Sequence, residues 1–177
     1  MFPMRPVTGR ALRTVDQVDQ LIVQMRSCAW VVQPKLNGDR ACLAVVNKRV
    51  YIQNRHGGWL SHTVTNAKDF LKLPSGTALD GEVYKGEFHP FELLALGGKS
   101  YLFATVDVRE IMAERMCTLL GHPWLFPRPT RKWLMELSDN APMYEGVVMK
   151  KAGAGSNYIL LGNATQTSLT WLKKRWV

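Results

Sequence analysis

The residues of this chain best suited to chemistry lie in one stretch, Gln33-Pro34-Lys35-Leu36-Asn37-Gly38-Asp39-Arg40. Lys35 follows an apolar run that begins at Ala29, and a second apolar run extends from Ala41 to Val46. This pattern predicts two strands joined through a turn at Gly38. A lysine held there beside other cations has its ammonium form disfavoured, and the neutral amine is a nucleophile. The stretch alone fits a solvated hairpin lysine equally well, so the rest of the chain must decide between the two.

Four later stretches also place polar side chains beside apolar runs, as expected for a site built from several strands. They are Asn54–Gly57, Leu79–Val83, Tyr144–Lys150 and Trp171–Arg175. Side chains two residues apart on a strand point to the same face, so Asp80 and Glu82 share a face, as do Lys173 and Arg175. Solvated charges at strand ends are the alternative interpretation of each stretch taken alone.

In this order the five stretches resemble the motifs of the covalent nucleotidyltransferases, which are ATP-dependent DNA ligases, RNA ligases and mRNA capping enzymes. The first stretch resembles their lysine-any-Asp-Gly-any-Arg signature, with Lys35 in the position of the nucleophile. The resemblance extends from about Trp30 to the C-terminus. It implies a lysine that takes AMP from ATP and passes it to a nucleic-acid end. Asn37 departs from the signature, which usually has Asp; an amide brings no negative charge and cannot serve as a base.

The resemblance also implies a nucleotide site around Lys35. Its residues would be Gln33, Arg40, Arg55, Glu82, Val106, Val147, Lys150, Lys173 and Arg175. Glu82 would bind a ribose hydroxyl, and Arg55 would bind a phosphate of AMP or of the DNA end. Glu145, with Asp80 as a second candidate, would assist Mg²⁺, a hard ion that prefers oxygen ligands.

The base of the nucleotide needs apolar neighbours. The family usually has Phe or Tyr directly before an Asp at this point, and the best match here is Phe103-Ala104-Thr105-Val106-Asp107-Val108. The residue before Asp107 is Val106, so we expect Val106 to cover one face of the base and Val147 to cover the other. Phe103 would face away from Val106 on a strand and belong to the core.

The elements predicted from periodicity make a single α+β domain over residues 1–177, with mainly antiparallel sheets. The predicted helices are 15–26, 65–73, 111–120 and 131–137. The predicted strands are 30–35, 40–46, 50–54, 77–84, 101–108, 124–126, 146–151 and 168–174. Residues 1–14 are expected to be irregular, 91–96 helix or loop, and 153–157 a loop. The resemblance implies the nucleotidyltransferase fold of a DNA ligase adenylation domain, with helices flanking antiparallel sheets and a nucleotide groove between them.

The composition is compatible with an intracellular protein that binds nucleic acid. The chain has 23 basic and 14 acidic side chains, a net charge of +9, which favours a polyanion partner, although a basic surface without a role is the alternative. No apolar run approaches the ~18 residues of a membrane span, and the first residues form no signal core. Cys28, Cys42 and Cys117 lack metal-ligand spacing and predict free thiols in a reducing, cytoplasmic or other intracellular compartment.

We therefore expect the adenylation domain of an ATP-dependent DNA ligase, a monomer that uses ATP and Mg²⁺ on nicked double-stranded DNA. The sequence ends directly after the last motif, and we expect no OB-fold in it. The chain would be either an isolated core domain or a naturally minimal ligase, and an OB-fold domain or protein supplied in trans is one way to complete it. Self-adenylylation should be impaired relative to a complete ligase, and nick sealing more so. Two alternatives stay open. One is an RNA ligase or capping-type guanylyltransferase. The other, suggested by Asn37 and Val106, is a nucleic-acid-binding module with a decayed site.

Overall fold

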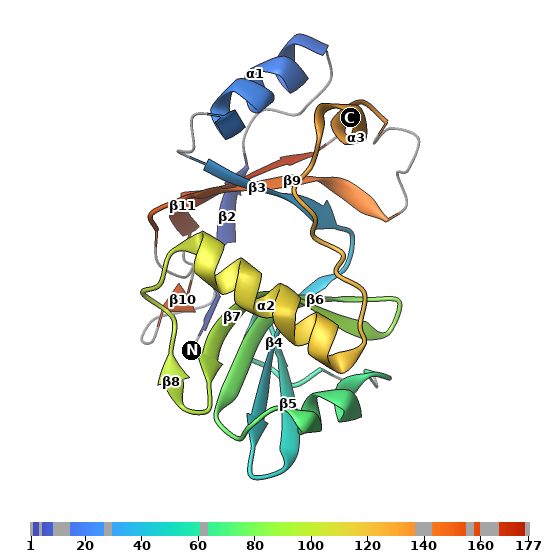
Figure 1. Ribbon diagram of the computed structural model, residues 1–177, viewed down its shortest axis with the longest axis vertical. Helices are drawn as coiled ribbons and strands as arrows, with labels where there is room; N and C mark the ends of the chain where they lie inside the picture. The colour runs from blue at the N-terminus through green and yellow to red at the C-terminus, as the bar shows by residue number, and fades with distance from the viewer. Residues whose placement is uncertain are drawn as a thin grey trace.

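Two β-sheets form the framework of the chain (Figure 1). The computed structural model describes residues 2–3, 5–8, 15–26, 30–60, 64–136, 143–154, 158–159 and 167–175. The larger sheet has five strands in the order β5-β4-β6-β7-β8 and the smaller has four in the order β2-β11-β9-β3. Few helices accompany them, so the predicted α+β class with mainly antiparallel sheets is confirmed.

The five-stranded sheet is antiparallel throughout. It consists of β4 (Asp39–Val46), β5 (Arg49–Asn54), β6 (Thr77–Tyr84), β7 (Glu87–Leu96) and β8 (Lys99–Ser100). Alternate residues of β4, namely Ala41, Leu43 and Val45, are buried, as the two-residue period of a strand requires. They belong to the largest core cluster, which also takes side chains from η1 (Ala67–Lys72) and α2 (Val106–Leu120).

The four-stranded sheet contains β3 (Trp30–Leu36), β9 (Tyr144–Lys151), β11 (Thr167–Arg175) and β2 (Arg5–Thr8). Its neighbours are antiparallel except β2, which lies parallel to β11. Helices α1 (Val15–Arg26) and α3 (Arg131–Met135) pack on the face that points away from the larger sheet (Figure 1). A two-stranded pair, β1 (Phe2–Pro3) with β10 (Tyr158–Ile159), lies apart from both sheets in the hydrogen-bond pattern.

The turn at Gly38 carries the chain from one sheet to the other. Strand β3 belongs to the smaller sheet and β4 to the larger one, so the predicted turn is present, but the strands it joins do not form a hairpin. A Cβ at Gly38 would lie 2.3 Å from the backbone oxygen of Val83, so only glycine fits where the turn crosses β6. Lys35, near the end of β3, consequently faces the space between the sheets.

Four predicted elements differ from the structure. Residues 91–96 belong to strand β7, in which residues 88–94 are all buried, so no two-residue alternation marks the strand in the sequence. Val106 begins helix α2 rather than lying within a strand; Thr105 occupies the N-cap position with an extended backbone, and Asp107 lies in the first turn. Residues 124–126 form no strand, and the N-terminal segment expected to be irregular contains β1 and β2. Part of the loop expected at 153–157 lies outside the described residues.

Candidate functional site

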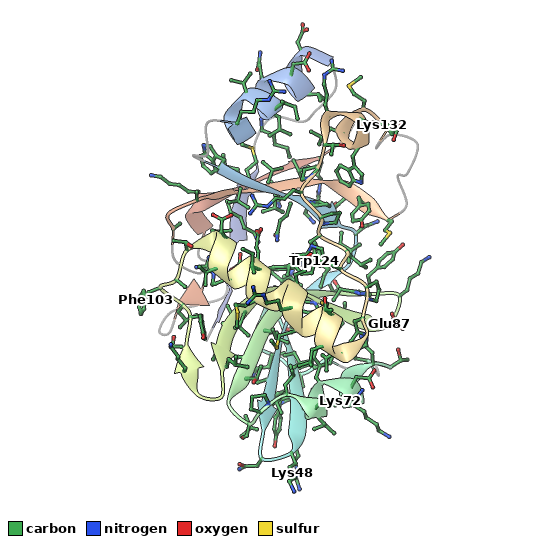
Figure 2. The ribbon with its side chains drawn as sticks, in the orientation of Figure 1. Lys48, Lys72, Glu87, Phe103, Trp124 and Lys132 are labelled. Carbon is green, nitrogen blue, oxygen red and sulfur yellow. The ribbon has the colours of Figure 1, made fainter. Side chains whose placement is uncertain are left out.

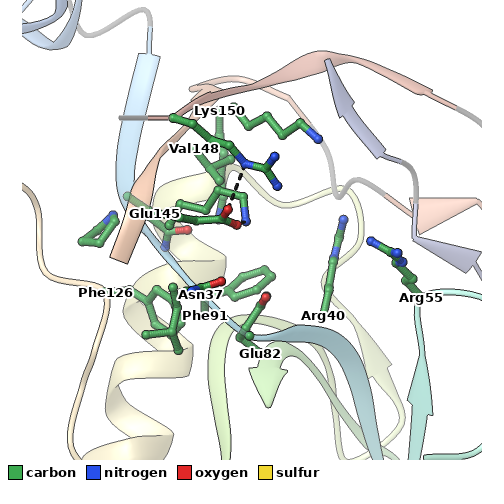
Figure 3. Close-up of a pocket in the computed structure, with 16 residues that line it drawn as sticks. Asn37, Arg40, Arg55, Glu82, Phe91, Phe126, Glu145, Val148 and Lys150 are labelled. Carbon is green, nitrogen blue, oxygen red and sulfur yellow. Dashed lines mark hydrogen bonds and ion pairs between the residues drawn. The ribbon is translucent and has the colours of Figure 1, made fainter. Parts of the chain in front are cut away.

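A cleft of about 300 Å³ lies between the two sheets (Figure 3). It brings together nine residues that the sequence predicted for the site: Gln33, Lys35, Arg40, Arg55, Glu82, Glu145, Lys150, Lys173 and Arg175. They come from β3, β4, β6, β9 and β11 and from the loop after β5. Asn37 and Gly38 also line the cleft. Residues far apart in the sequence therefore meet at the crossing between the sheets.

Lys35 contacts a carboxylate in this cleft. Its Nζ donates to Oε1 of Glu145, and Nε of Arg175 donates to Oε2 of the same carboxylate at 2.8 Å. Lys35 pairs with Gly146 across β3 and β9, and Glu145 directly precedes Gly146. This register brings the side chains of Lys35 and Glu145 together. Gly146 has a φ of 148°, and a Cβ there would lie 1.9 Å from the backbone oxygen of Lys174, so β11 can approach only a glycine. The sequence predicted cations beside Lys35, whereas its direct partner is an acid.

Asp80 lies outside the cleft and holds Arg40. The Arg40 guanidinium donates to both oxygens of the carboxylate, from Nε at 3.1 Å and from Nη2 at 2.6 Å. Asp80 is fully buried and does not line the cleft, so its place does not suit the suggested metal ligand. A bidentate pair fixes the direction of a guanidinium, so Asp80 orients Arg40 toward the cleft.

Arg55 follows strand β5 at the mouth of the cleft, beside Arg40 (Figure 3). Its Nε donates to Nε2 of His56 at 3.1 Å. Arg55 is exposed, and in the described part of the chain it takes part in no ion pair. A guanidinium in this position can bind two oxygens of a phosphate that enters the cleft.

The carboxyl of Glu82 is partly buried in the cleft. Burial raises its pKa to about 7, against the opposing effect of the positive charges of Lys35 and Arg40. At neutral pH the ionised and the neutral form of this carboxyl are therefore both populated. In either state it can hydrogen-bond a hydroxyl, as acceptor when ionised and also as donor when neutral.

Lys150 is held by a buried network of charges. Its Nζ donates to Glu92 at 2.6 Å and lies 3.4 Å from Glu110, while Nε of Arg109 donates to the second oxygen of Glu92 at 2.8 Å. Burial disfavours the ionised form of Glu92, but the charges and hydrogen bonds of Lys150 and Arg109 outweigh it, so the pKa of Glu92 is lowered. Burial raises the pKa of Glu110 to about 7. The network joins α2, β7 and β9 behind the cleft.

The apolar wall of the cleft differs from the prediction. Val106 is fully buried at the start of α2 and does not line the cleft, and Phe103 is 91% exposed rather than in the core (Figure 2). Phe91 lines the cleft instead, packed edge-to-face on Phe126 with ring centroids 5.5 Å apart. The sequence signal was available, since Phe91 directly precedes the acidic Glu92.

Val147 also points away from the cleft. It is fully buried in the cluster under α1, with Val18 and Leu21, while its neighbour Val148 lines the cleft. Successive residues of a strand face opposite sides, so Val148, and not Val147, is the valine of β9 that can contact a base in the cleft.

Gln33 presents an unpaired donor to this space. The side chain is 2% exposed and lines the cleft, and its Nε2 has no hydrogen-bond partner among the described residues. A buried donor without a partner costs about 1–3 kcal/mol, so an acceptor atom of a ligand would satisfy it. Together with the cations and the Phe91 ring, this donor set fits a nucleotide with its phosphates.

A metal in this cleft would take oxygen ligands from a bound nucleotide as well as from the protein. The described residues contain no group of three or more His, Cys, Asp or Glu side chains arranged around a metal. Glu82 and Glu145 are the carboxylates that line the cleft. Mg²⁺ commonly binds through one or two carboxylates, waters and substrate phosphates, so these two suit it. Cys42 and Cys117 are free thiols, Cys28 lies outside the described residues, and no described helix is long and apolar enough to cross a membrane.

The arrangement of two sheets around a basic cleft is shared by solved structures of DNA ligases. A mycobacterial DNA ligase D complexed with ATP superimposes with a TM-score of 0.71 at 17% identity, covering 99% of this chain and 60% of that one. The ligase domain of LigD from M. tuberculosis gives 0.68 at 16% identity, covering 99% and 59%. A protein designated Pmar-Lig gives 0.65 at 17% identity, covering 98% and 46%.

The chain spans about 60% of the length of the ligase D structures. At these identities the likeness is one of fold. No protein-family model matches the sequence, and no curated protein matches it.

Proposed function

We propose that this chain is the adenylation domain of an ATP-dependent DNA ligase. The observation that carries the proposal is the Lys35 amine, in contact with Glu145 inside a cleft lined by further cations and the Phe91 ring. The fold is that of polynucleotide ligases, and the site contains the groups that transfer of AMP to a lysine requires. These are a nucleophile, an apolar surface for a base, a carboxyl for a sugar and positive charge for phosphates.

The proposed first step joins AMP to Lys35. The ammonium of Lys35 releases a proton, for which the Glu145 carboxylate in contact with it is the acceptor. The neutral amine then attacks the α-phosphorus of ATP. A nitrogen–phosphorus bond forms, the bond from that phosphorus to the bridging oxygen breaks, and pyrophosphate leaves with the electron pair. Positive charge along the cleft stabilises the charge that develops on the phosphates.

The later steps pass AMP to nucleic acid. A 5′-phosphate oxygen of a nicked strand attacks the phosphorus, and the Lys35 amine leaves and regains a proton. The 3′-hydroxyl of the adjoining strand then attacks the 5′-phosphorus and releases its proton to water. The bond from that phosphorus to the oxygen that bridges to AMP breaks, AMP leaves with the electron pair, and the strand is sealed. Arg40 and Arg55, which line the mouth of the cleft, would hold these phosphates.

The remaining side chains bind the nucleotide. Phe91 and Val148 offer apolar contact to the base, and Nε2 of Gln33 offers a donor to one of its acceptors. Glu82 binds a ribose hydroxyl. Lys150, Lys173 and Arg175 contribute positive charge. Mg²⁺, held by phosphate oxygens and by Glu145 as its protein ligand, would neutralise phosphate charge when bound.

The biological setting is also a proposal. The net charge of +9 supports a nucleic-acid partner. The free thiols of Cys42 and Cys117 support a reducing, intracellular location. We propose that the chain acts as a monomer with an OB-fold domain or protein supplied in trans, which would close over the cleft during the first step.

Radiolabelled ATP and GTP, offered with nicked DNA or nicked RNA, test the proposal. We expect label from ATP on the protein, loss of that label on addition of nicked DNA, and sealed product. Preference for GTP would indicate a capping-type guanylyltransferase, and preference for nicked RNA an RNA ligase. Nucleic-acid binding without any protein label would contradict the proposal and favour a binding module with a decayed site.

A further inference from the structure

The chain crosses between the two sheets again in residues 121–130, which we call the strap. The strap begins at the end of α2, which packs on the larger sheet, and leads into α3, which packs on the smaller one (Figure 1). It forms no helix or strand, and the prolines in it restrict its backbone. The crossing at Gly38 follows the strand that carries the nucleophile, and the strap also reaches the cleft, through Phe126.

Both halves of the molecule hold the strap. On the side of the smaller sheet, the hydroxyl of Tyr144 in β9 donates to the backbone oxygen of Leu125 at 2.9 Å. On the side of the larger sheet, Arg128 forms ion pairs with two acids of α2, and the pair with Glu110 has a distance of 3.3 Å. Phe126 lies between these anchors, so its place in the cleft is fixed from both sides.

The ring of Phe126 meets the ring of Phe91 in the wall of the cleft. Phe126 is 4% exposed, and the planes of the two rings lie at 78° to each other. Trp124 packs on Phe126 in a similar way, with ring centroids 5.6 Å apart at 71°. Leu36 belongs to the same buried cluster. The Phe91 ring is therefore held by the strap as well as by its own strand, β7.

The orientation of an aromatic ring decides whether a base can pack on it. The χ2 torsion of phenylalanine has a broad energy minimum, so the backbone of β7 alone does not fix the ring plane of Phe91. An edge-to-face neighbour favours one orientation, and aromatic pairs of this kind change equilibria by about two- to tenfold. A ring that is already fixed loses less freedom when a ligand binds, so the contact with Phe126 should increase the affinity for a base.

We propose that Phe126 is a positioning residue for the base of the nucleotide and that it acts by fixing the ring of Phe91. The inference rests on the proposed function for the identity of the ligand. Phe126 has no group that could take part in proton or phosphoryl transfer. It should therefore affect the binding of ATP and leave the chemical step at Lys35 unchanged.

The rate of covalent AMP labelling of the whole chain, followed at increasing ATP concentrations, separates binding from chemistry. Phe126→Leu keeps an apolar side chain without a ring. We expect it to raise the half-saturating ATP concentration about fivefold and to leave the maximal rate within about twofold, because only the edge-to-face contact is lost. Phe126→Met, which also lacks a ring, gives the same prediction should Phe126→Leu not fold.

Phe70→Leu is the matched control. Phe70 packs edge-to-face on Phe88 with ring centroids 5.5 Å apart at 77°, nearly the geometry of Phe126 on Phe91. Phe70 and Phe88 belong to the core under the larger sheet and do not line the cleft. The control should lower the urea midpoint and leave the half-saturating ATP concentration unchanged.

A double-mutant cycle shows whether Phe126 acts through Phe91. Phe91→Leu alone should raise the half-saturating concentration about tenfold, and the double variant should match it, because without the Phe91 ring Phe126 has nothing to position. Independent effects would multiply to about fiftyfold.

The proposal is overturned if Phe126→Leu needs no more ATP than the wild type, if Phe70→Leu needs as much, if the maximal rate falls instead, or if the two changes multiply. Covalent AMP on the wild-type protein, measured by mass in the same preparation, shows separately whether the proposed function stands, and its absence would overturn both.

Discussion

Replacement of Glu92 by Gln should destabilise the fold strongly, because one buried carboxylate serves two buried cations. Glu92 and Arg109 are fully buried and Lys150 is 1% exposed, with Arg109 and Lys150 at 2.8 and 2.6 Å from opposite oxygens of the carboxylate. Removing one member of a buried ion pair costs about 3–5 kcal/mol, since it leaves an uncompensated charge. Glu110 lies 3.4 Å from Lys150 and supplies part of a replacement charge, which favours the lower end, about 3 kcal/mol.

Urea unfolding followed by tryptophan fluorescence measures this change. A loss of about 3 kcal/mol in a chain of 177 residues corresponds to a fall in Tm of about 6–12 °C. Arg131→Ala is the matched control, because Arg131 pairs with Asp19 at a comparable 2.7 Å, but both side chains are about half exposed. This control should leave the urea midpoint unchanged. A midpoint for Glu92→Gln equal to that of the control would refute the view that the network is a buried, charged unit.

Three further results are expected. The raised pKa of Glu82, about 7 against an ordinary 4.5, means that the folded state holds this proton more tightly, so stability falls as pH rises through that window. Between pH 4.5 and 7.5 the free energy of unfolding of the wild type should fall by about 3 kcal/mol because of Glu82, and Glu82→Gln should abolish that part of the fall. Urea midpoints at the two pH values measure it, and an equal fall in Glu82→Gln would contradict the burial of the carboxyl. Phe91→Leu should raise the KM for ATP about tenfold, while Val106→Ala should lower the urea midpoint and leave KM within about twofold; the reverse pattern would restore Val106 to the site. Gly38→Ala should cost about 2 kcal/mol of folding free energy, because its Cβ would overlap a backbone oxygen of β6, whereas Gly153→Ala, with open space around it, should be neutral by the same measurement.

The strands that carry the chemical groups could be predicted from the sequence because their signals are local. Apolar runs bounded by turns placed β3, β4, β6, β9 and β11 within a few residues of the observed bounds. The helix at 15–26 was found from its periodicity. What periodicity could not show is that β3 and β4 belong to different sheets, because strand pairing depends on contacts between distant residues.

The apolar wall of the cleft was mislocated for a definite reason. A run of β-branched residues around Thr105 and Val106 imitates a strand, yet tertiary packing makes it the start of α2. A strand at this point would turn Val106 toward the base. Phe91 was overlooked because its run is buried on both faces and shows no alternation.

The direct partners of the charged groups were likewise beyond prediction. The contact of Lys35 with Glu145 joins residues 110 positions apart, and the buried pair of Arg40 with Asp80 joins residues 40 apart. The sequence contained the right residue types, and the pairing followed only from the register of the strands that meet at the cleft.

The central claim is that Lys35 becomes covalently joined to AMP. Intact mass spectrometry after incubation with ATP and Mg²⁺, followed by digestion and mapping of the modified peptide, tests it most directly. We predict a mass increase of one AMP unit, located on Lys35, which pyrophosphate reverses and which Lys35→Arg abolishes while the variant keeps its urea midpoint. An adduct that persists in Lys35→Arg, or the absence of any adduct on the wild-type protein with an OB-fold domain supplied in trans, would contradict the claim.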